Sequence, residues 1–428
     1  MKEKLTINNF LSIAHLEWEP SAYNVITGEM GSGKTICLKL LYFIYEIFNK
    51  TVFDNLSENI FLKDTFYLKL KQQFIKIFEI DNSASSEITY SFEDKNVFDL
   101  SIAINNGNVS FTSAYIESRL ETLNFRMSQG LKQNQFNSEE QIKSVIFKDI
   151  EADIGLSFPF GQIYFSDLRT LLAEPNMIVP TDECTREMLK YKGFLSRGIE
   201  QILKRNAIHP IDEDHRDIDT LIRKVYKILH IEDIKTINDS IYLIQQNKRK
   251  TSIDKSSSGQ RELFHLLNFI ILMQSSTFSY SNTAILFIEE PEAHLFPNEQ
   301  KLLLELLGET FQILNEKEVK WRFFLTTHSP YLLNVFNNML FKGSLLKEYQ
   351  GNTKKIEKIN AHVTFTDFNP DQVSAIFLKR QKETFSFTGY SIIEKGSNAP
   401  FLFSKEIEDI TFEINDDYSK LEILKDSM

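Results

Sequence analysis

The sequence predicts an α/β fold with a mixed central sheet and helices on both of its faces. A glycine cluster lies between a β-branched, strand-like run (23–27) and a largely apolar helix that begins at Lys34. Strand, helix and strand patterns follow one another over 284–325, which is how parallel sheets are built. Two short alternating segments, 4–10 and 15–18, add antiparallel strands at the N-terminus. Parallel and antiparallel pairing in one chain indicate a mixed sheet.

The region after the first helix is rich in alternating apolar and polar residues. The segments FYLKL, FIKIFEI, EITYSFE and NVSFTSAYI all lie within or next to residues 60–112. Alternation with a period of two is typical of half-buried strands. We therefore expect an N-terminal antiparallel meander of short strands.

The middle of the chain is polar and charged, and its pattern predicts helices from Ile116 to about Leu156 and again over 183–250. It contains no catalytic motif, so we interpret it as an inserted helical lobe. The texture changes after Ser256. There we expect a helix at about 259–274, a strand at 284–288, a helix at about 298–314, a strand at 321–325, and then a helix followed by short strands.

Composition narrows the class of protein. The chain has 48 basic and 59 acidic residues, a net charge of −11, so no global positive field attracts nucleic acid or anionic lipid. Its apolar runs are far shorter than the roughly 18 residues of a membrane span, and its first residues contain no apolar signal-peptide core. With only Cys37 and Cys184, disulfide scaffolds and cysteine-built zinc sites are excluded. We expect a soluble, cytoplasmic protein without a membrane partner.

The glycine cluster is a G-x-x-x-x-G-K-T phosphate loop between a strand and a helix, the context that this motif requires. Backbone N–H groups of such a loop surround phosphate oxygens, and the helix N-terminus adds favourable partial charge. The lysine reaches the β- and γ-phosphates, and the final hydroxyl ligates Mg²⁺. The predicted ATP-binding residues are Gly28, Glu29, Met30, Gly31, Ser32, Gly33, Lys34 and Thr35. The alternative is a plain turn that closes a hairpin.

An acidic pair ends the apolar strand ILFI. Glu289 and Glu290 follow at its carboxyl end, where open α/β sheets bind ligands, and Pro291 ends the strand. Neighbouring strand residues point to opposite sides, so the two acids have different roles. We assign Glu289, with Thr35, to Mg²⁺, and Glu290 to orienting or deprotonating the attacking water. The alternative is a strand that ends in solvated acids.

Two further motifs flank this strand. Ser257 and Gly259 lie in SSSGQ, directly before a helix, where small residues form a phosphate-seeking site. An ordinary serine N-cap is the alternative. His328 lies in TTHSP after the next strand, where an imidazole would hydrogen-bond the γ-phosphate or the water; the alternative is a structural histidine. We count His328 with Glu290 and Lys34 as catalytic.

These motifs, in this order, resemble the pattern of the ATP-binding-cassette ATPases. INNFLSIAHLEWEPSAYNVITGEMGSGKT (7–35), IEEPEAHLFP (288–297) and LTTHSPYLL (325–333) are similar to segments of a soluble branch of that family. This branch includes the overcoming-lysogenisation-defect (OLD) ATPases and the Septu-type and PARIS-type anti-phage defence ATPases. The specific motifs cover roughly 1–45 and 250–335.

The resemblance implies a mechanism in which two heads enclose two ATP molecules. Ser257 and Gly259 would then act in trans on the partner's γ-phosphate, in a homodimer or a higher even-numbered homo-oligomer. Gln72 and Gln73 are candidates for the family's phosphate-sensing glutamine. The signature departs from the family, because Ser258 adds a Cβ where a glycine usually lies.

The family pattern divides the chain into four expected parts. These are an N-terminal ATPase lobe (1–115), a mainly helical inserted lobe (116–250), a C-terminal ATPase lobe (251–345) and a C-terminal α/β extension (346–428). No nuclease pattern follows the histidine motif. We therefore expect the regulatory or sensor ATPase of an anti-phage system, acting with a separately encoded effector.

Two other functions stay open. A DNA-repair or chromosome-maintenance ATPase of the SMC/RecF type would clamp nucleic acid, which the basic stretches Lys248–Lys250 and Lys379–Lys382 permit but do not indicate. An ATP-stabilised scaffold would bind ATP with little turnover. Both share the predicted fold, ATP and Mg²⁺.

Overall fold

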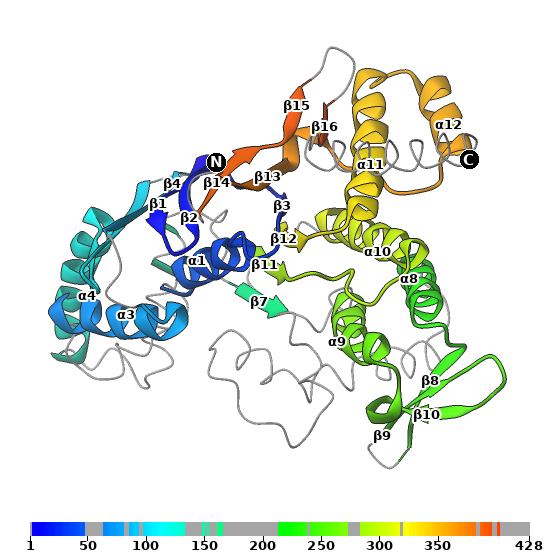
Figure 1. Cartoon of the computed structure of the whole chain (residues 1–428), viewed down its shortest axis with the longest axis horizontal. Helices are drawn as coiled ribbons and strands as arrows, with labels where there is room; N and C mark the ends of the chain where they lie inside the picture. Colours follow the sequence, from blue (N-terminus) through cyan, green and yellow to red (C-terminus); the bar gives the residue numbers. More distant parts are fainter. Residues whose placement is uncertain are drawn as a thin grey trace, which may run out of the picture.

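One eleven-stranded sheet organises the chain in the computed structural model (Figure 1). From edge to edge its strands are β6 (Asn108–Thr112), β5 (Val97–Asn105), β4 (Ser86–Glu93), β1 (Lys2–Phe10), β2 (Ile13–Trp18), β14 (Phe387–Ser391), β13 (Val373–Arg380), β3 (Tyr23–Gly28), β12 (Lys320–Thr327), β11 (Thr283–Ile288) and β7 (Gly161–Phe165). The structure describes residues 2–47, 63–80, 85–93, 97–132, 148–149, 152–153, 161–165, 213–237, 240–272, 283–316, 320–381, 386–395 and 400–402.

The sheet has two halves with different pairing. The strands from β6 to β2 are antiparallel to their neighbours, while β13, β3, β12, β11 and β7 are parallel. Strand β14 joins the halves, because it is antiparallel to β13 and parallel to β2. The predicted mixed sheet is therefore confirmed.

The meander prediction is right for β4, β5 and β6 but wrong for the segment before them. Residues 63–78, which include FYLKL and most of FIKIFEI, form a helix, α3 (Lys63–Phe78). Its buried residues are Phe66, Leu70, Phe74 and Phe78, spaced by four. This spacing places four large apolar side chains on one face of a helix, which outweighs the local alternation.

The middle of the chain is only partly helical. Helices α4 (Ala114–Lys132) and α8 (Glu213–Leu229) lie where helices are expected. Residues 233–252, however, form a separate three-stranded antiparallel sheet of β8 (Asp233–Ile237), β9 (Ser240–Ile244) and β10 (Lys250–Ser252). Cys184 and the rest of 182–212 lie outside the described residues.

Strand β7 also lies within this middle block, yet it belongs to the central sheet. It pairs in parallel with β11, from Gly161 beside Ala284 to Phe165 beside Ile288. A strand of only five residues carries too little pattern to be assigned to a sheet from sequence.

The C-terminal half follows the predicted order of elements. After the short 3₁₀ turn η3 (Ile253–Lys255), the helices are α9 (Ser258–Leu272), α10 (Pro297–Glu316), α11 (Pro330–Glu348) and α12 (Thr353–His362). The last described elements are the 3₁₀ turn η4 (Pro370–Gln372), β13, β14, and the small pair β15 (Ile393–Lys395) and β16 (Pro400–Leu402). The expected C-terminal extension therefore supplies two strands, β13 and β14, to the central sheet.

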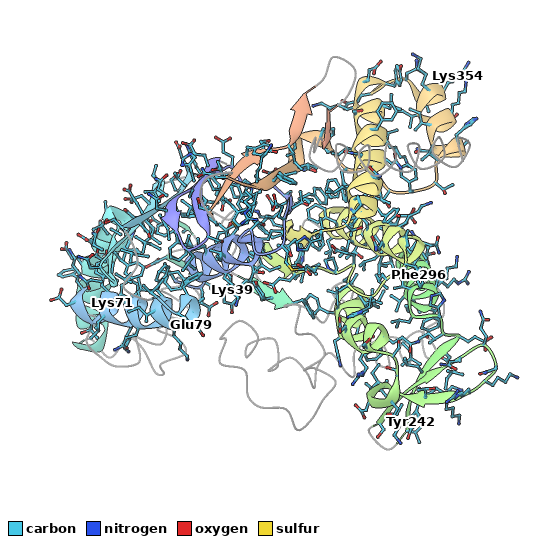
Figure 2. All side chains as sticks on the ribbon, viewed as in Figure 1. Lys39, Lys71, Glu79, Tyr242, Phe296 and Lys354 are labelled. Atoms are coloured by element: carbon cyan, nitrogen blue, oxygen red, sulfur yellow. The ribbon has the colours of Figure 1, made fainter. Side chains whose placement is uncertain are left out.

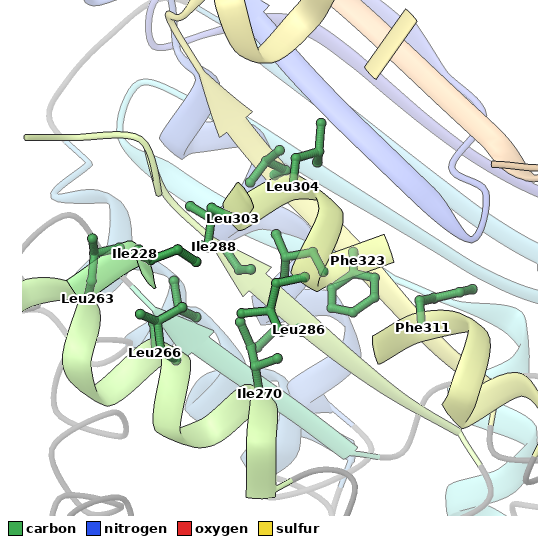
Figure 3. Close-up of a cluster of buried hydrophobic side chains, with 14 of the residues drawn as sticks. Ile228, Leu263, Leu266, Ile270, Leu286, Ile288, Leu303, Leu304, Phe311 and Phe323 are labelled. Carbon is green, nitrogen blue, oxygen red and sulfur yellow. The ribbon is translucent and has the colours of Figure 1, made fainter. Parts of the chain in front are cut away.

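Alternate residues of each central strand face two different cores. Leu286 and Ile288 of β11 pack with α8, α9 and α10 on one face, as the labelled cluster in Figure 3 shows. Ile285 and Phe287 point to the other face, which α1 (Lys34–Glu46) and α3 cover. The prediction of helices on both faces is confirmed, and it follows from the period-two alternation of the strands.

A buried ion pair links the two halves of the sheet. Nη2 of Arg322, on β12, lies 2.8 Å from Oε2 of Glu3, on β1. The Tyr90 hydroxyl donates to Glu3 Oε1 at 2.9 Å, and the Tyr45 hydroxyl donates to the same oxygen. Four elements thus share one buried charged cluster.

None of the helices in the described part of the chain combines the length and the apolar character that a membrane span needs.

Candidate functional site

The candidate site lies where three neighbouring parallel strands end. Strands β3, β12 and β11 pair in parallel, with Thr27 beside Thr327 and Ile288 beside Leu325. The loops that follow them, 29–33, 328–329 and 289–296, therefore leave from the same edge of the sheet. These are the loops that carry the predicted phosphate-loop, histidine and acidic residues.

The phosphate loop has the backbone geometry that its glycines permit. Gly33 has φ +95°, and a Cβ there would lie 2.8 Å from Ser12 Oγ and 2.9 Å from an Ile13 side-chain carbon. Gly28 has φ +148°, and a Cβ there would lie 2.6 Å from the Leu378 carbonyl of β13. A side chain at either position would displace the backbone beside it. Helix α1 starts at Lys34 with no side-chain cap, so its first N–H groups face the loop.

Lys34 is held inside the loop. Its Nζ donates to the carbonyls of Glu29, at 2.8 Å, and Gly28, at 3.2 Å. Burial lowers the pKa of Lys34 to about 8, while the negative charges of Glu290 and Glu292 act in the opposite direction. The lysine therefore lies between backbone acceptors and two carboxylates. This is the position from which an ammonium group contacts a bound phosphate.

Glu290, His328 and Lys34 form a continuous chain of contacts. His328 Nε2 lies 3.0 Å from Glu290 Oε1, and Lys34 Nζ lies 3.5 Å from His328 Nδ1. Because the ammonium group only donates, Nδ1 accepts, and the Nε2–H tautomer donates to Glu290. The structure thus brings together the three residues that the sequence predicts to be catalytic.

The backbone at Glu290 is strained. Its φ is +39°, a region that residues other than glycine rarely adopt. The Glu290 N–H donates to both the carbonyl and the hydroxyl of Thr326, each at 3.1 Å. Strain of this kind gathers at functional sites, where surrounding bonds hold it in place. Here Thr326, one strand away, holds the backbone that carries the carboxylate.

Glu289 lies in a different environment from Glu290. It is buried, its N–H donates to the Phe165 carbonyl at 2.9 Å, and the Tyr164 hydroxyl donates to its Oε1. The sequence analysis missed Tyr164, because β7 was not recognised as part of the sheet. The only available signal was the short apolar run IYF at 163–165. The two acids do have separate surroundings, as the alternation of strand residues predicts.

The predicted Mg²⁺ ligands have suitable chemistry. The Thr35 hydroxyl and the Glu289 carboxylate offer the hard oxygen atoms that Mg²⁺ prefers. Thr35 is half-buried in the first turn of α1. Across the described residues, no group of three or more His, Cys, Asp or Glu side chains is arranged to hold a metal. Two hard oxygen donors fit a Mg²⁺ ion, because this ion takes most of its other ligands from nucleotide phosphates and water. Thr35 and Glu289 would hold it.

A further carboxylate, Glu292, has no role in the sequence analysis. It is 9 % exposed, and its Oε1 accepts from the His328 backbone N–H at 2.9 Å and from the Thr327 hydroxyl at 2.5 Å. Its signal in the sequence was the third acid of the EEPE segment, which falls two residues after Glu290. Glu292 connects the acidic loop directly to the histidine loop.

The signature segment has a local structural role. The Ser257 hydroxyl accepts from the Gln260 N–H at 3.3 Å, and the Gln260 side-chain oxygen accepts from the Ser257 N–H at 3.3 Å. This reciprocal pair is a capping box at the start of α9. A Cβ on Gly259 would lie 3.2 Å from the His294 Cβ, and His294 Nε2 lies 3.4 Å from Glu262 Oε1.

The N-cap alternative for Ser257 therefore describes this chain, while its action in trans stays a prediction. Although Ser257 caps the helix, it is exposed on the surface. Gln72 and Gln73 lie in the middle of α3 and not in a loop that follows a strand.

Comparisons with known proteins agree with a nucleotide-binding fold. Residues 182–333 match the family model AAA_15, an AAA ATPase domain. The matched segment covers less than half of the chain, and it includes Ser257, Glu289, Glu290 and His328 but not the phosphate loop. No curated protein matches the sequence. The chain thus combines an α/β fold with a phosphate loop and a segment similar to an ATPase domain.

Three solved structures are among those that the comparison with known structures found. An SmcHead bound to the C-winged helix domain of ScpA has a TM-score of 0.42 and 12% identity, over 91% of this chain and 97% of that one. The SMC head domain from Thermotoga maritima has a TM-score of 0.38 and 11% identity, over 91% and 98%. An Smc head domain with an extended coiled coil, bound to the C-terminal domain of ScpA derived from Pyrococcus furiosus, has a TM-score of 0.40 and 11% identity, over 97% and 99%.

Proposed function

We propose that this protein is a cassette-type ATPase that binds ATP with Mg²⁺ and hydrolyses it to ADP and phosphate. The contact chain from Lys34 through His328 to Glu290, beside the phosphate loop, is the observation that carries this proposal. It joins a phosphate-binding cation to a carboxylate that is half-exposed and therefore reachable by water.

Each residue has a distinct role in this proposal. Lys34 neutralises the β- and γ-phosphate oxygens. Glu290 orients the attacking water and accepts its proton, and His328 donates from Nε2 to keep the Glu290 carboxylate in place. Mg²⁺, when bound through Thr35 and Glu289, draws charge from the phosphate oxygens.

Steady-state ATP turnover of the purified chain tests this function. His328→Ala removes the donor to Glu290 and should lower kcat by at least 10-fold. His362→Ala is the matched control, since His362 is exposed on α12 and should leave kcat unchanged. A wild-type chain without turnover, or equal rates for both variants, would refute the assignment.

We further propose that two copies of the chain meet across this face and complete each other's ATP sites. The two most exposed large apolar side chains described are Met30, on the phosphate loop, and Phe296, the last residue of the acidic loop, at 88 % and 80 % exposure. Tyr331, after the histidine loop, is 55 % exposed. Apolar side chains on two of the site loops and in the first turn of α11, at one edge of the sheet, favour a protein interface there. In the dimer, Ser257 and Gly259 would contact the partner's γ-phosphate.

Replacing Met30 and Phe296 by serine should prevent ATP-dependent dimerisation while ATP still binds. Phe341→Ser is the matched control, because Phe341 is 50 % exposed but lies on α11, outside the site loops. Molar mass measured by light scattering, with and without ATP, distinguishes the variants. A Met30/Phe296 variant that dimerises like the wild type would remove the support for this face.

The leading biological hypothesis is a cytoplasmic sensor or regulatory subunit of a prokaryotic anti-phage system. In this hypothesis, the nucleotide cycle changes how the heads associate, and the heads act on a separately encoded effector. Support comes from the family resemblance of the EEPE and THSP segments. Co-purification from the native operon, with ATP, with ADP and without nucleotide, tests it. If no neighbour-encoded protein binds in any of these states, the hypothesis fails.

Exposed cations favour one second candidate, an ATPase that clamps nucleic acid. Lys248, Arg249 and Lys250 are exposed at the turn between β9 and β10, and Lys255 is exposed just before the signature. Such a group contacts phosphates without reading sequence. This candidate predicts duplex binding that requires ATP and weakens steeply with salt. Binding that is absent at low salt would exclude it.

A further inference from the structure

We propose that Glu292 is a positioning residue of the hydrolytic site, which fixes the backbone of His328 so that the imidazole reaches Glu290. This inference rests on the proposed ATPase function, and it gives a role to a buried carboxylate that the phosphate loop and acidic pair do not use. Glu292 lies two residues after Glu290, across Pro291, and reaches over to the loop that follows β12.

The contacts of Glu292 converge on one oxygen. Oε1 accepts both the His328 backbone N–H and the Thr327 side-chain hydroxyl. Two bonds to consecutive residues fix both the position and the direction of the peptide that precedes the histidine. A hydrogen bond from a backbone N–H to an ionised carboxylate is stronger than one to a neutral acceptor. The histidine backbone is therefore tied to the same loop that carries Glu290.

The residue after His328 is fixed from the same segment. The Ser329 N–H donates to Thr327 Oγ1 at 2.9 Å, and the Ser329 hydroxyl donates to Gln300 Oε1 at 2.5 Å. Gln300 lies in the first turn of α10, eight residues after Glu292. His328 is thus bracketed by Thr327, which Glu292 holds, and by Ser329, which Gln300 holds. Only its side chain, which is 33 % exposed, is directed toward Glu290 and Lys34.

Burial makes this arrangement informative. A carboxylate that is 9 % exposed loses most of its hydration, which is costly unless its bonds compensate. Oε1 of this carboxylate accepts both bonds from the histidine loop, and the ammonium group of Lys34 is among the nearby charges. A neutral amide would accept the same two bonds, whereas a methyl group would accept neither. Glutamine and alanine at this position therefore separate the effect of the bonds from that of side-chain volume.

The experiment compares Glu292→Ala and Glu292→Gln in the full chain, with Glu299→Ala as the matched control. Glu299 is also a buried carboxylate, but it lies on α10 and pairs with His230 at 3.2 Å. Two readouts are needed. One is steady-state ATPase kinetics, and the other is amide hydrogen exchange of residues 326–332 without nucleotide. The exchange measurement does not depend on turnover, so it judges the positioning role even if the chain proves not to hydrolyse ATP.

We expect Glu292→Ala to lower kcat by about 10- to 100-fold, because a small displacement of a catalytic group has effects of this size. KM should change less than about twofold, the His328 amide should exchange faster, and Glu292→Gln and Glu299→Ala should behave like the wild type. In a His328→Ala background, Glu292→Ala should cause no further loss, because it acts through the histidine. If Glu292→Ala does not fold, Thr327→Val removes one of the two bonds to Glu292, together with the acceptor of the Ser329 N–H, and should also lower kcat and speed His328 exchange.

The proposal is overturned if Glu292→Ala leaves both kcat and His328 exchange at wild-type values. It is also overturned if Glu292→Ala slows the His328→Ala enzyme by its full factor, which would mean that the two residues act independently. A wild-type chain without turnover, together with faster His328 exchange in Glu292→Ala, would instead reject the ATPase function and retain the positioning of the loop.

Discussion

At the scale of single residues, the site depends on charges that backbone groups and loops hold in place. Lys34 contacts two backbone carbonyls and the His328 ring, and His328 contacts Glu290. Each of these side chains follows a different parallel strand: Lys34 comes after β3, His328 after β12 and Glu290 after β11. Their meeting is a consequence of strand order and explains why distant sequence motifs form one site.

Lys34→Ala should abolish ATP binding. The substitution removes the only ammonium group that the described contacts place inside the phosphate loop. It therefore removes the positive charge that contacts the β- and γ-phosphates. Equilibrium binding of a fluorescent ATP analogue measures the effect. Lys354→Ala, on exposed α12 (Figure 2), is the control and should bind normally. Unchanged affinity in Lys34→Ala would contradict the phosphate-loop assignment.

The residues of the site differ in how visible they are in the sequence. The phosphate loop, Glu289, Glu290 and His328 are visible because each is part of a motif at the end of an apolar strand. Tyr164 is not visible, since its importance depends on a pairing between β7 and β11 that spans more than a hundred residues. Such pairings are long-range packing outcomes, and local patterns do not contain them.

At the scale of elements, α3 shows how burial selects between two local patterns. Its Phe74 ring packs between Phe10, Phe43, Phe78 and Phe111, with centroid distances of 4.7–5.8 Å. The same residues alternate well enough to suggest strands. A helix brings all four buried side chains to one face within a short length. A strand would also place them on one face, but it would spread them over a much longer distance than this core spans.

Phe74→Ala should lower the free energy of unfolding by about 3–5 kcal/mol, because it opens a cavity among buried aromatic rings. Leu68→Ala is the control on the same helix. Leu68 is 54 % exposed, so its loss should change stability by less than about 0.5 kcal/mol. Urea denaturation followed by circular dichroism measures both. Equal, small effects would mean that α3 does not pack as described.

The elements that sequence patterns predict correctly are those whose apolar pattern is clear over the whole element. Helices α9, α10 and α11 and the strands β3, β11 and β12 fall where predicted, because each is flanked by clear turn residues. The small sheet of β8, β9 and β10 was predicted as helix. Its strands have three to five residues, which is too short for the period of a charged segment to be determined.

At the scale of the whole molecule, the Glu3–Arg322 pair ties the antiparallel half of the sheet to the parallel half. Arg322 belongs to β12, in the ATP-site half, and Glu3 to β1, in the meander half. Both side chains are buried. Strand β14 makes a similar connection, because it pairs with β13 in the parallel half and with β2 in the antiparallel half.

Arg322→Met should destabilise the protein by about 3–5 kcal/mol, because it leaves the Glu3 carboxylate buried without its cation. The double variant Glu3→Gln/Arg322→Met removes both charges and should recover part of this loss. The free energy of unfolding in urea measures both variants. A double variant that is less stable than Arg322→Met alone would show that the ion pair is not the cause.

The most direct test of the central claim is the mass and turnover of Glu290→Gln in the presence of Mg²⁺ and ATP. The amide keeps the shape of the side chain but neither accepts a proton nor carries charge. We predict that turnover falls by about 10²–10⁴-fold while ATP stays bound and light scattering reports twice the monomer mass. Wild-type turnover in Glu290→Gln, or a monomer with ATP bound, would contradict a hydrolytic site completed by two heads.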